Sequence, residues 1–264
     1  MTNLSIFDMM TTFYNFEHST KTKVVGSAPW GQLELTQPLN FNSMLKRDEL
    51  PKQSEFRLKG NSRLTDLLSC FSIDILNCFI VSSKMHSILK DFNLQEHQWA
   101  NCTIRKKEKT WDYHLLRFAQ SRDKKRRPLL CCPEIVDWKN SVFFEDSHAR
   151  FGGIKGNEPI LKIDSYDDYL KVQAEYNRQF DEHENVDLTI GVMKFAFNEE
   201  YMEKNNPDMC WLFPLHSNPL ISERLKTALE ENDITGIETM EINSYICRND
   251  EEVLGNVFKE LGVR

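Results

Sequence analysis

The sequence lacks the features that mark an exported or membrane-embedded protein. Its first residues, MTNLSIFDMM, have neither the basic start nor the continuous apolar core of a secretion signal. All apolar runs are of strand length, far short of the roughly 20 residues that a membrane-crossing helix needs. We therefore expect a cytoplasmic protein without membrane contact.

Cysteine usage argues against a disulfide framework. The seven cysteines are an odd number, and no CxxC pair occurs. Cys131 and Cys132 are adjacent, and the others lie mostly among apolar neighbours, as buried thiols do. We expect reduced thiols, with no metal site and no cofactor.

No motif of a known catalytic centre is present. "GGIKGN" at 152–157 is neither a Walker loop nor a dinucleotide fingerprint, and no GxSxG elbow or HExxH pair occurs. His114 could project beside Asp112, but a lone histidine has no catalytic role without a partner. The sequence therefore predicts a protein that is not an enzyme. An enzyme whose site is assembled from residues far apart in the chain stays open as an alternative.

The charge balance favours a basic partner. The chain has 33 basic and 40 acidic residues, a net charge of −7, and non-specific nucleic-acid binding suits a basic protein better. Two basic stretches, 105–109 and 122–127, flank a predicted strand. If they lie together with Trp111 and Tyr113, they could bind phosphates and stack bases, so a nucleic-acid-binding regulator is the second hypothesis. Two charged hairpin loops are the simpler interpretation.

A strand–helix–strand pattern occupies residues 78–104. "CFIV" is a short apolar run of strand length, and Ser82 follows it at the position of a helix N-cap. Alternating apolar residues at 100, 102 and 104 predict the returning strand. The helix has one apolar face, formed by Met85, Ile88, Leu89 and Phe92.

The same pattern returns at 218–242 with a constant offset. Ser222 lies 140 positions after Ser82, and Ile234 matches Leu94. The helix-face residues Leu225, Ala228 and Leu229 match Met85, Ile88 and Leu89. This match favours an internal duplication over chance similarity.

Further strands and helices are expected elsewhere. Ser165, followed by Asp168, predicts a capped helix that runs to about Phe180, and the acidic stretch 181–187 reads as a loop. Asn249 is expected to cap a C-terminal helix. Strand patterns cover 22–30, 111–119, 129–138 and 188–197.

These elements predict an α+β fold with antiparallel or mixed sheets and interspersed helices. A length of 264 residues suits one large domain or two smaller ones. We predict a strand-rich extension at 1–55, packed on a main body at 56–264. The duplication suggests halves at about 56–150 and 151–264.

Several short motifs resemble those of bacterial polymorphic-toxin immunity proteins, of the class first named from a myxobacterial domain. "FIVSSKMHSIL" and "LISERLKTALEENDITGIETMEI" look like that family's two Ser-capped helices, in which Ser-x-(Arg/Lys)-(Leu/Met) recurs. "DYHLLRF" and "EIVDWKNSVFF" are similar to its central segment, with Tyr113, Asp137, Ser141 and Phe143 at the motif positions. The resemblance covers roughly 56–242. The chain departs from it at Ser83, where the second copy has Glu223, and in the basic loop 122–127.

The resemblance implies a cytoplasmic protein that neutralises a cognate toxin by direct contact, without catalytic residues. Acidic surfaces of such proteins can mimic the charge of a toxin's substrate, so a basic toxin is the expected partner. The candidate contacts are the acidic residues Asp181, Glu182, Glu184, Asp187, Glu199, Glu200 and Glu203.

Overall fold

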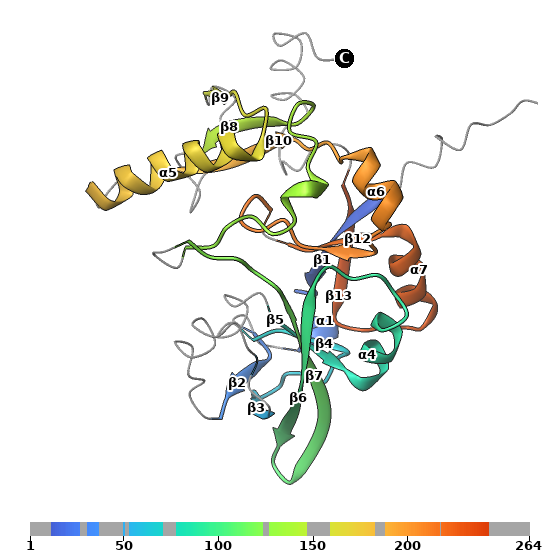
Figure 1. Cartoon of the computed structure of the whole chain (residues 1–264). Coiled ribbons are helices and arrows are strands. Elements are labelled where there is room, and N and C mark those ends of the chain that lie inside the picture. Colours follow the sequence, from blue (N-terminus) through green and yellow to red (C-terminus); the bar gives the residue numbers. More distant parts are fainter. Residues whose placement is uncertain are drawn as a thin grey trace, which may run out of the picture. The chain divides into compact units, whose positions relative to one another are not determined.

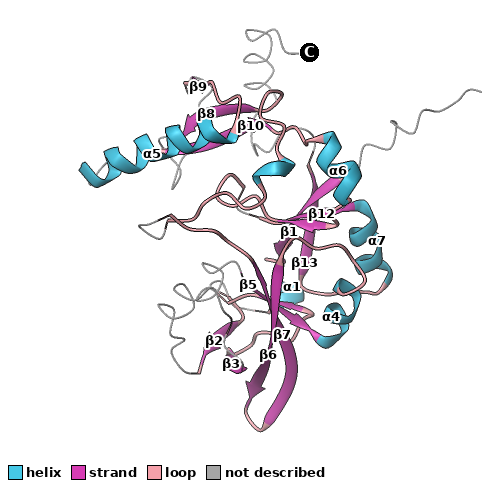
Figure 2. Ribbon diagram, viewed as in Figure 1, coloured by secondary structure: helices cyan, strands magenta, loops and turns pink. Residues whose placement is uncertain are grey.

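The computed structural model confirms an α+β fold of mostly strands with interspersed helices (Figures 1 and 2). The chain forms two compact units, which are described separately. Unit 1 comprises Met1–Cys131 and Asn206–Glu241, and unit 2 comprises Cys132–Asn205 and Ile242–Arg264. The structure describes residues 12–26, 31–36, 50, 53–70, 78–123, 127–146, 159–182, 188–216 and 218–242.

Unit 1 contains a six-stranded sheet of order β2-β3-β6-β7-β5-β4. All its neighbours are antiparallel except β3 and β6, which run parallel. β6 and β7 form the long hairpin seen in Figure 1. The strands are β2 (Leu33–Leu35), β3 (Gln53–Leu58), β4 (Leu67–Leu68), β5 (Cys78–Ser82), β6 (His97–Lys106) and β7 (Lys109–Phe118).

Unit 1 also contains a four-stranded antiparallel sheet of order β11-β12-β1-β13. Two short helices, α4 (Ser83–Leu89) and α7 (Glu223–Glu231), follow β5 and β12 and contact each other. A single helical turn, α1 (Thr22–Val25), follows β1. The strands are β1 (Phe13–His18), β11 (Met209–Cys210), β12 (Leu220–Ser222) and β13 (Ile237–Glu241).

Two halves of unit 1 share one arrangement. We call β4, β5, α4, β6 and β7 the first half, and β11, β12, α7, β13 and β1 the second half. The strand order β4-β5-β7-β6 matches β11-β12-β1-β13, and all of these neighbours are antiparallel in both halves. The halves differ in connection, because β7 follows β6 directly whereas β1 comes from the start of the chain.

The register of the strands also agrees between the halves. Ser82 lies opposite Tyr113 and Ser222 opposite Phe13, while Ala100 faces Leu115 as Met240 faces Asn15. Every paired residue of β12 and β13 lies 140 positions after its counterpart in β5 and β6. Every residue of β1 lies 100 positions before its counterpart in β7. Such agreement over all three strands indicates that the duplication includes β1.

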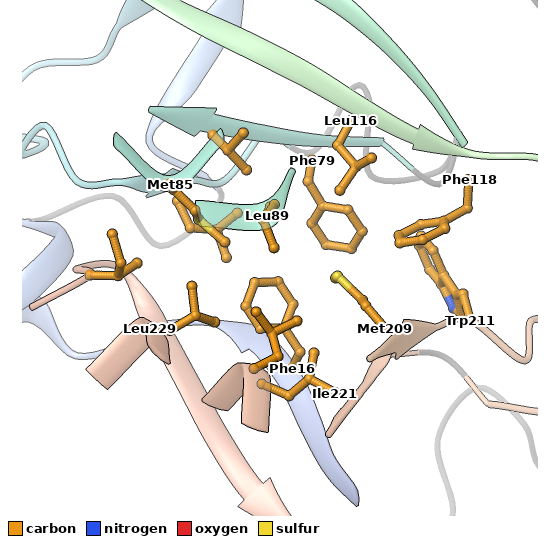
Figure 3. Packing of buried hydrophobic residues seen from close by; sticks show 14 residues of the cluster. Phe16, Phe79, Met85, Leu89, Leu116, Phe118, Met209, Trp211, Ile221 and Leu229 are labelled. Atoms are coloured by element: carbon orange, nitrogen blue, oxygen red, sulfur yellow. The ribbon is translucent and has the colours of Figure 1, made fainter. Parts of the chain in front are cut away.

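The halves share one hydrophobic core (Figure 3). Corresponding residues fill it from both sides, such as Met85 with Leu225 and Leu89 with Leu229, all at most 1% exposed. Burying such a side chain stabilises the fold by roughly 1.5–3 kcal/mol. Repeated apolar faces therefore form this core. Its buried members are Phe16, Leu67, Phe79, Val81, Met85, Leu89, Leu116, Phe118, Met209, Trp211, Ile221, Leu225, Leu229 and Ile234.

A second core cluster involves β2 to β7 and contains three of the cysteines. Cys70, Cys78 and Cys102 are buried as free thiols there. Burial raises the pKa of the Cys102 thiol to about 12, so it stays protonated at neutral pH.

Unit 2 combines a three-stranded antiparallel sheet, order β10-β8-β9, with two helices. Trp138 stacks against Phe143 of β8 and contacts Tyr169 of α5 with its ring tilted, and so links helix to sheet. The elements are a short 3-10 helix (Pro133–Ile135), β8 (Val142–Asp146), β9 (Ile160–Leu161), α5 (Tyr166–Glu182), β10 (Thr189–Lys194) and α6 (Glu199–Asn205).

Several local predictions were wrong. Residues 129–138 are no strand, because Cys132 has a left-handed φ of 51° and Pro133 starts the 3-10 helix. Residues 22–25 form a helical turn, and the strand expected at 188–197 ends at Lys194. The extension at 1–55 and the main body at 56–264 stay predictions; unit 1 holds residues from both, and unit 2 interrupts unit 1. The helix that Asn249 was expected to cap lies outside the described residues.

Candidate partner-binding surfaces

Ser82 is the N-cap of α4 and belongs to a wider network. Its hydroxyl accepts the Met85 backbone N–H at 3.1 Å and donates to Asp66 Oδ1 at 2.6 Å. Asp66 Oδ2 accepts the backbone N–H and the hydroxyl of Thr235 at 2.9 and 2.8 Å. Burial raises the pKa of Asp66, but these hydrogen bonds and the charge of Lys84 outweigh it and lower that pKa.

Ser222 repeats the arrangement as the N-cap of α7. Its hydroxyl accepts the Leu225 N–H at 3.2 Å and donates to Asp208 Oδ1 at 2.8 Å. Asp208 is 1% exposed, and its Oδ2 accepts the Asn93 backbone N–H at 2.8 Å. Arg224 donates to both carboxylate oxygens of Asp208.

The two aspartates tie the halves together reciprocally. Each one bonds the cap serine of its own half and the loop that follows the helix of the other half. Lys84 and Arg224, two residues after the serines, face these carboxylates, and Met85 and Leu225 enter the core. The Ser-x-(Lys/Arg)-(Met/Leu) motif is therefore a fold motif. In unit 2, Ser165 caps α5 in the same way, because its hydroxyl accepts the Asp168 N–H at 3.2 Å.

The first half presents histidines beside α4. The rings of His86 and His114 stack with centroids 3.8 Å apart, and His86 also contacts Trp99. Ser83 Oγ lies 3.3 Å from His114 Nε2 and the same distance from the Asp112 carbonyl oxygen. Burial, with the neighbouring charges of His114 and Lys90, lowers the pKa of His86 to about 4.

Ser83 and His114 could serve as the nucleophile and base of a catalytic serine site, but such a site needs a third residue. A serine nucleophile needs a base that a third group orients. The nearest acid, Asp112, contributes its backbone carbonyl to Ser83 rather than its carboxylate to the imidazole. The described ranges contain no group of three or more His, Cys, Asp or Glu residues that could hold a metal.

The corresponding positions of the second half carry different side chains, one of them acidic. Glu223 replaces Ser83, Tyr14 replaces His114, and the Tyr14 hydroxyl donates to the Glu223 carboxylate. This hydrogen bond, burial, and the charges of Glu223, Glu241 and Glu230 raise the pKa of Tyr14 to about 12. Lys226 lies over the Tyr14 ring at 4.4 Å. The first half builds the same elements without these carboxylates, so the fold does not require them.

Two helices carry acids at the end where they oppose the helix dipole. A helix C-terminus favours positive charge, yet α5 ends with Asp181 and Glu182 and has no basic residue in its last turn. The end of α7, at Glu230 and Glu231, is also acidic and without a base. The helix dipole therefore does not favour these acids, although Glu182 pairs with Arg178 and Glu230 with Lys226 one turn earlier.

The predicted contact residues fall into separate groups. Asp181 and Glu182 belong to the last turn of α5, not to a loop as expected, and Glu184 and Asp187 lie outside the described residues. Glu199 and Glu200 are exposed in the first turn of α6, where the dipole favours them. Glu203 is exposed further along the same helix.

The described residues of the two basic stretches lie beyond opposite ends of β7. Residues 105–109 surround the β6–β7 turn, and Arg122 follows the opposite end of β7. Nine residue steps along a strand span roughly 30 Å. Tyr113 is also buried. The joint patch on which the nucleic-acid hypothesis depends is therefore not formed by the described residues of these stretches.

Sequence reasoning missed Asp66, Asp208 and Tyr14. Asp66 lies 16 residues before Ser82 and Asp208 lies 14 before Ser222, so no local spacing rule relates them. The repeated order of an Asp, a short strand and a Ser-led helix is the signal that could have found the two aspartates. Tyr14 joins α7 only through the pairing of β1 with β12.

No family model matches the chain, and no curated protein matches it. Among the helices of the described residues, none has the length and apolar character that crossing a bilayer requires.

Proposed function

We propose that this chain is a cytoplasmic immunity protein that binds and neutralises a cognate, basic bacterial toxin by direct contact. The carrying observation is a set of exposed carboxylates at positions that the helix dipole does not favour or that the first half of unit 1 fills without an acid. They occupy helix ends where the dipole opposes them, and positions where the first half of unit 1 has neutral or basic residues. The motif resemblance supplies the class of partner.

Asp181 and Glu182 are the preferred contacts among the predicted residues. Their position at the C-terminus of α5 opposes the helix dipole, although Glu182 also pairs with Arg178 one turn earlier, whereas the dipole favours Glu199 and Glu200 in the first turn of α6. Residues that break a local rule are expected at functional sites. An exposed apolar residue, Phe180, lies beside them at 47% exposure and could anchor the contact.

Co-expression with the toxin of an adjacent locus tests the proposal. Wild-type chain should restore growth and co-elute with the toxin on gel filtration. Replacing both Asp181 and Glu182 by Lys should weaken binding by about tenfold or more, which corresponds to the loss of charge pairs across an interface. The matched pair Glu199→Lys with Glu200→Lys should weaken it less. Growth arrest and separate elution with wild-type chain would refute the function.

A further inference from the structure

β13 is an end strand of its sheet. It pairs with β1 on one side, and within the described residues no strand lies on its other side. Met240 is 38% exposed and Glu241 is exposed as well. An open strand edge presents unpaired backbone groups that can pair with another chain.

The pairing pattern shows which backbone groups face outward. The Ser19 N–H donates to the Gly236 carbonyl at 2.8 Å, and these residues extend the β1–β13 register by one pair. In an antiparallel ladder such hydrogen-bonded pairs alternate with pairs whose backbone groups point away. The N–H and C=O groups of Ile237, Thr239 and Glu241 therefore point to the outer edge.

The first half shows what this edge can hold. On β6, the counterpart of β13, strand β3 lies parallel and pairs from Asn101 to Arg105. Before β3 begins, the Leu50 N–H donates to the Gln98 side chain at 3.2 Å. β3 therefore begins at the position that corresponds to Glu241, and the Leu50 N–H reaches the position that corresponds to Glu238, so the first half places a neighbouring chain segment along this edge.

The two edges differ in charge at the contact positions. Gln98 and Asn101 of β6 correspond to Glu238 and Glu241 of β13. Glu238 accepts hydrogen bonds from Ser19 and Thr20 and remains anionic, since the first of these bonds lowers its pKa most. A second copy paired on this edge would bring like charges together, which destabilises cross-strand contacts. A basic segment would be attracted.

We propose that the outer edge of β13, Ile237 to Glu241, docks an extended basic segment of a partner protein as an added strand. Backbone hydrogen bonds from Ile237, Thr239 and Glu241 provide the attachment, and the Glu241 carboxylate selects for Lys or Arg on the incoming strand. The inference rests in part on the proposed function, because it takes the basic partner from there and names one surface that holds it.

The test uses the full chain and a fluorescein-labelled peptide of about ten residues with alternating lysine and valine, the composition that strand addition favours here. Fluorescence anisotropy should show binding, and the matched glutamate–valine peptide should not bind. Thr239→Pro removes an outward backbone N–H and leaves the hydrogen bonds to β1 intact, so it should weaken peptide binding by at least about fivefold.

Glu241→Lys reverses the charge that selects the basic peptide and should weaken peptide binding by a similar factor. Glu108→Lys, the same charge change in the exposed β6–β7 turn, should leave it unchanged.

Hydrogen exchange of the outward β13 amides distinguishes which segment or molecule pairs with this edge. The Thr239 and Glu241 amides should exchange fast in the free chain and slowly with the lysine–valine peptide. Slow exchange in free monomer would mean that the chain covers its own edge, and slow exchange with dimerisation would mean a second copy. Either result, or equal peptide binding by wild type and both variants, would overturn the inference. A toxin complex that survives Thr239→Pro and Glu241→Lys would retain the proposed function and reject this surface. Circular dichroism checks that Thr239→Pro is folded.

Discussion

The two halves of unit 1 have the same register but different surfaces. Where they agree, as at the cap serines Ser82 and Ser222, the residues hold helices, core and crossing hydrogen bonds in place. Where they differ, as at His114 and Tyr14, the side chains lie at the surface beside α4 and α7. One half therefore serves as a control for the other, and it separates what the fold needs from what a partner could use.

The largest difference in stability is expected between the two aspartates. Asp208→Ala removes the buried acceptor of Ser222 and the Asn93 N–H and the partner of the exposed Arg224, and should cost about 3 kcal/mol. Asp66→Ala, at a half-buried position, should cost about 1–2 kcal/mol. Urea unfolding measures both. Equal losses of stability, or a larger loss for Asp66→Ala, would show that burial does not determine which aspartate contributes more.

Acidification should act on the second half through His216. Burial lowers the pKa of His216 to about 4, and its Nε2 meets Asn15 Oδ1, where the first half has Leu115. The neutral ring is favoured in the folded state, so its stabilisation is complete above about pH 6.5 and declines as the pH falls towards 4. At pH 5 the loss should reach about 2 kcal/mol.

Urea unfolding of wild type and His216→Gln between pH 7 and 4 checks this effect. The variant should be less stable at pH 7 but should lose less stability on acidification. Parallel pH curves would assign the acid sensitivity to other groups, such as His18 of β1, whose pKa burial also lowers to about 4, or His86 and His114 in the first half.

The two cap serines should contribute modestly different amounts to the stability of unit 1. Ser222 is 3% exposed and Ser82 is more accessible, so Ser222→Ala should cost about 2 kcal/mol and Ser82→Ala about 1 kcal/mol. Thermal unfolding compares them, with Ser87→Ala on the exposed face of α4 as the control. A loss at Ser82 as large as that at Ser222 would contradict the role of burial.

The smallest effect is expected from the acidic end of α7. Glu231→Lys should raise stability by about 0.5 kcal/mol, because a cation suits a helix C-terminus. Its counterpart Asp91 lies beyond the end of α4, so Asp91→Lys should change the stability less than Glu231→Lys does. Thermal midpoints measure both variants. Destabilisation by Glu231→Lys would mean that the carboxylate has a structural role.

Local rules predicted the parts of the fold that depend on neighbours in sequence. Ser82 and Ser222 stand directly before helical periods, so their capping could be read from spacing alone. The strand predicted at 129–138 was wrong because this irregular segment also buries apolar side chains, such as those of Leu130 and Ile135, and so has the hydrophobic pattern of a strand. The place of β1 could not be predicted, since its partners lie roughly 200 residues away. The acidic surface around Tyr14 depends on that pairing and was missed for the same reason.

The distant origin of β1 also determines when unit 1 can be completed on the ribosome. The β6–β7 hairpin can form once residue 118 has emerged, and β5 and α4 are then already present. β1 is synthesised before all of them but pairs only with β12 and β13, near the end of the described chain. At typical synthesis rates it waits roughly 10 to 40 s for these strands. During that time Phe13 and Phe16, which are buried in the folded chain, lack the strands that cover them, so β1 is the strand of unit 1 that waits longest for its partners.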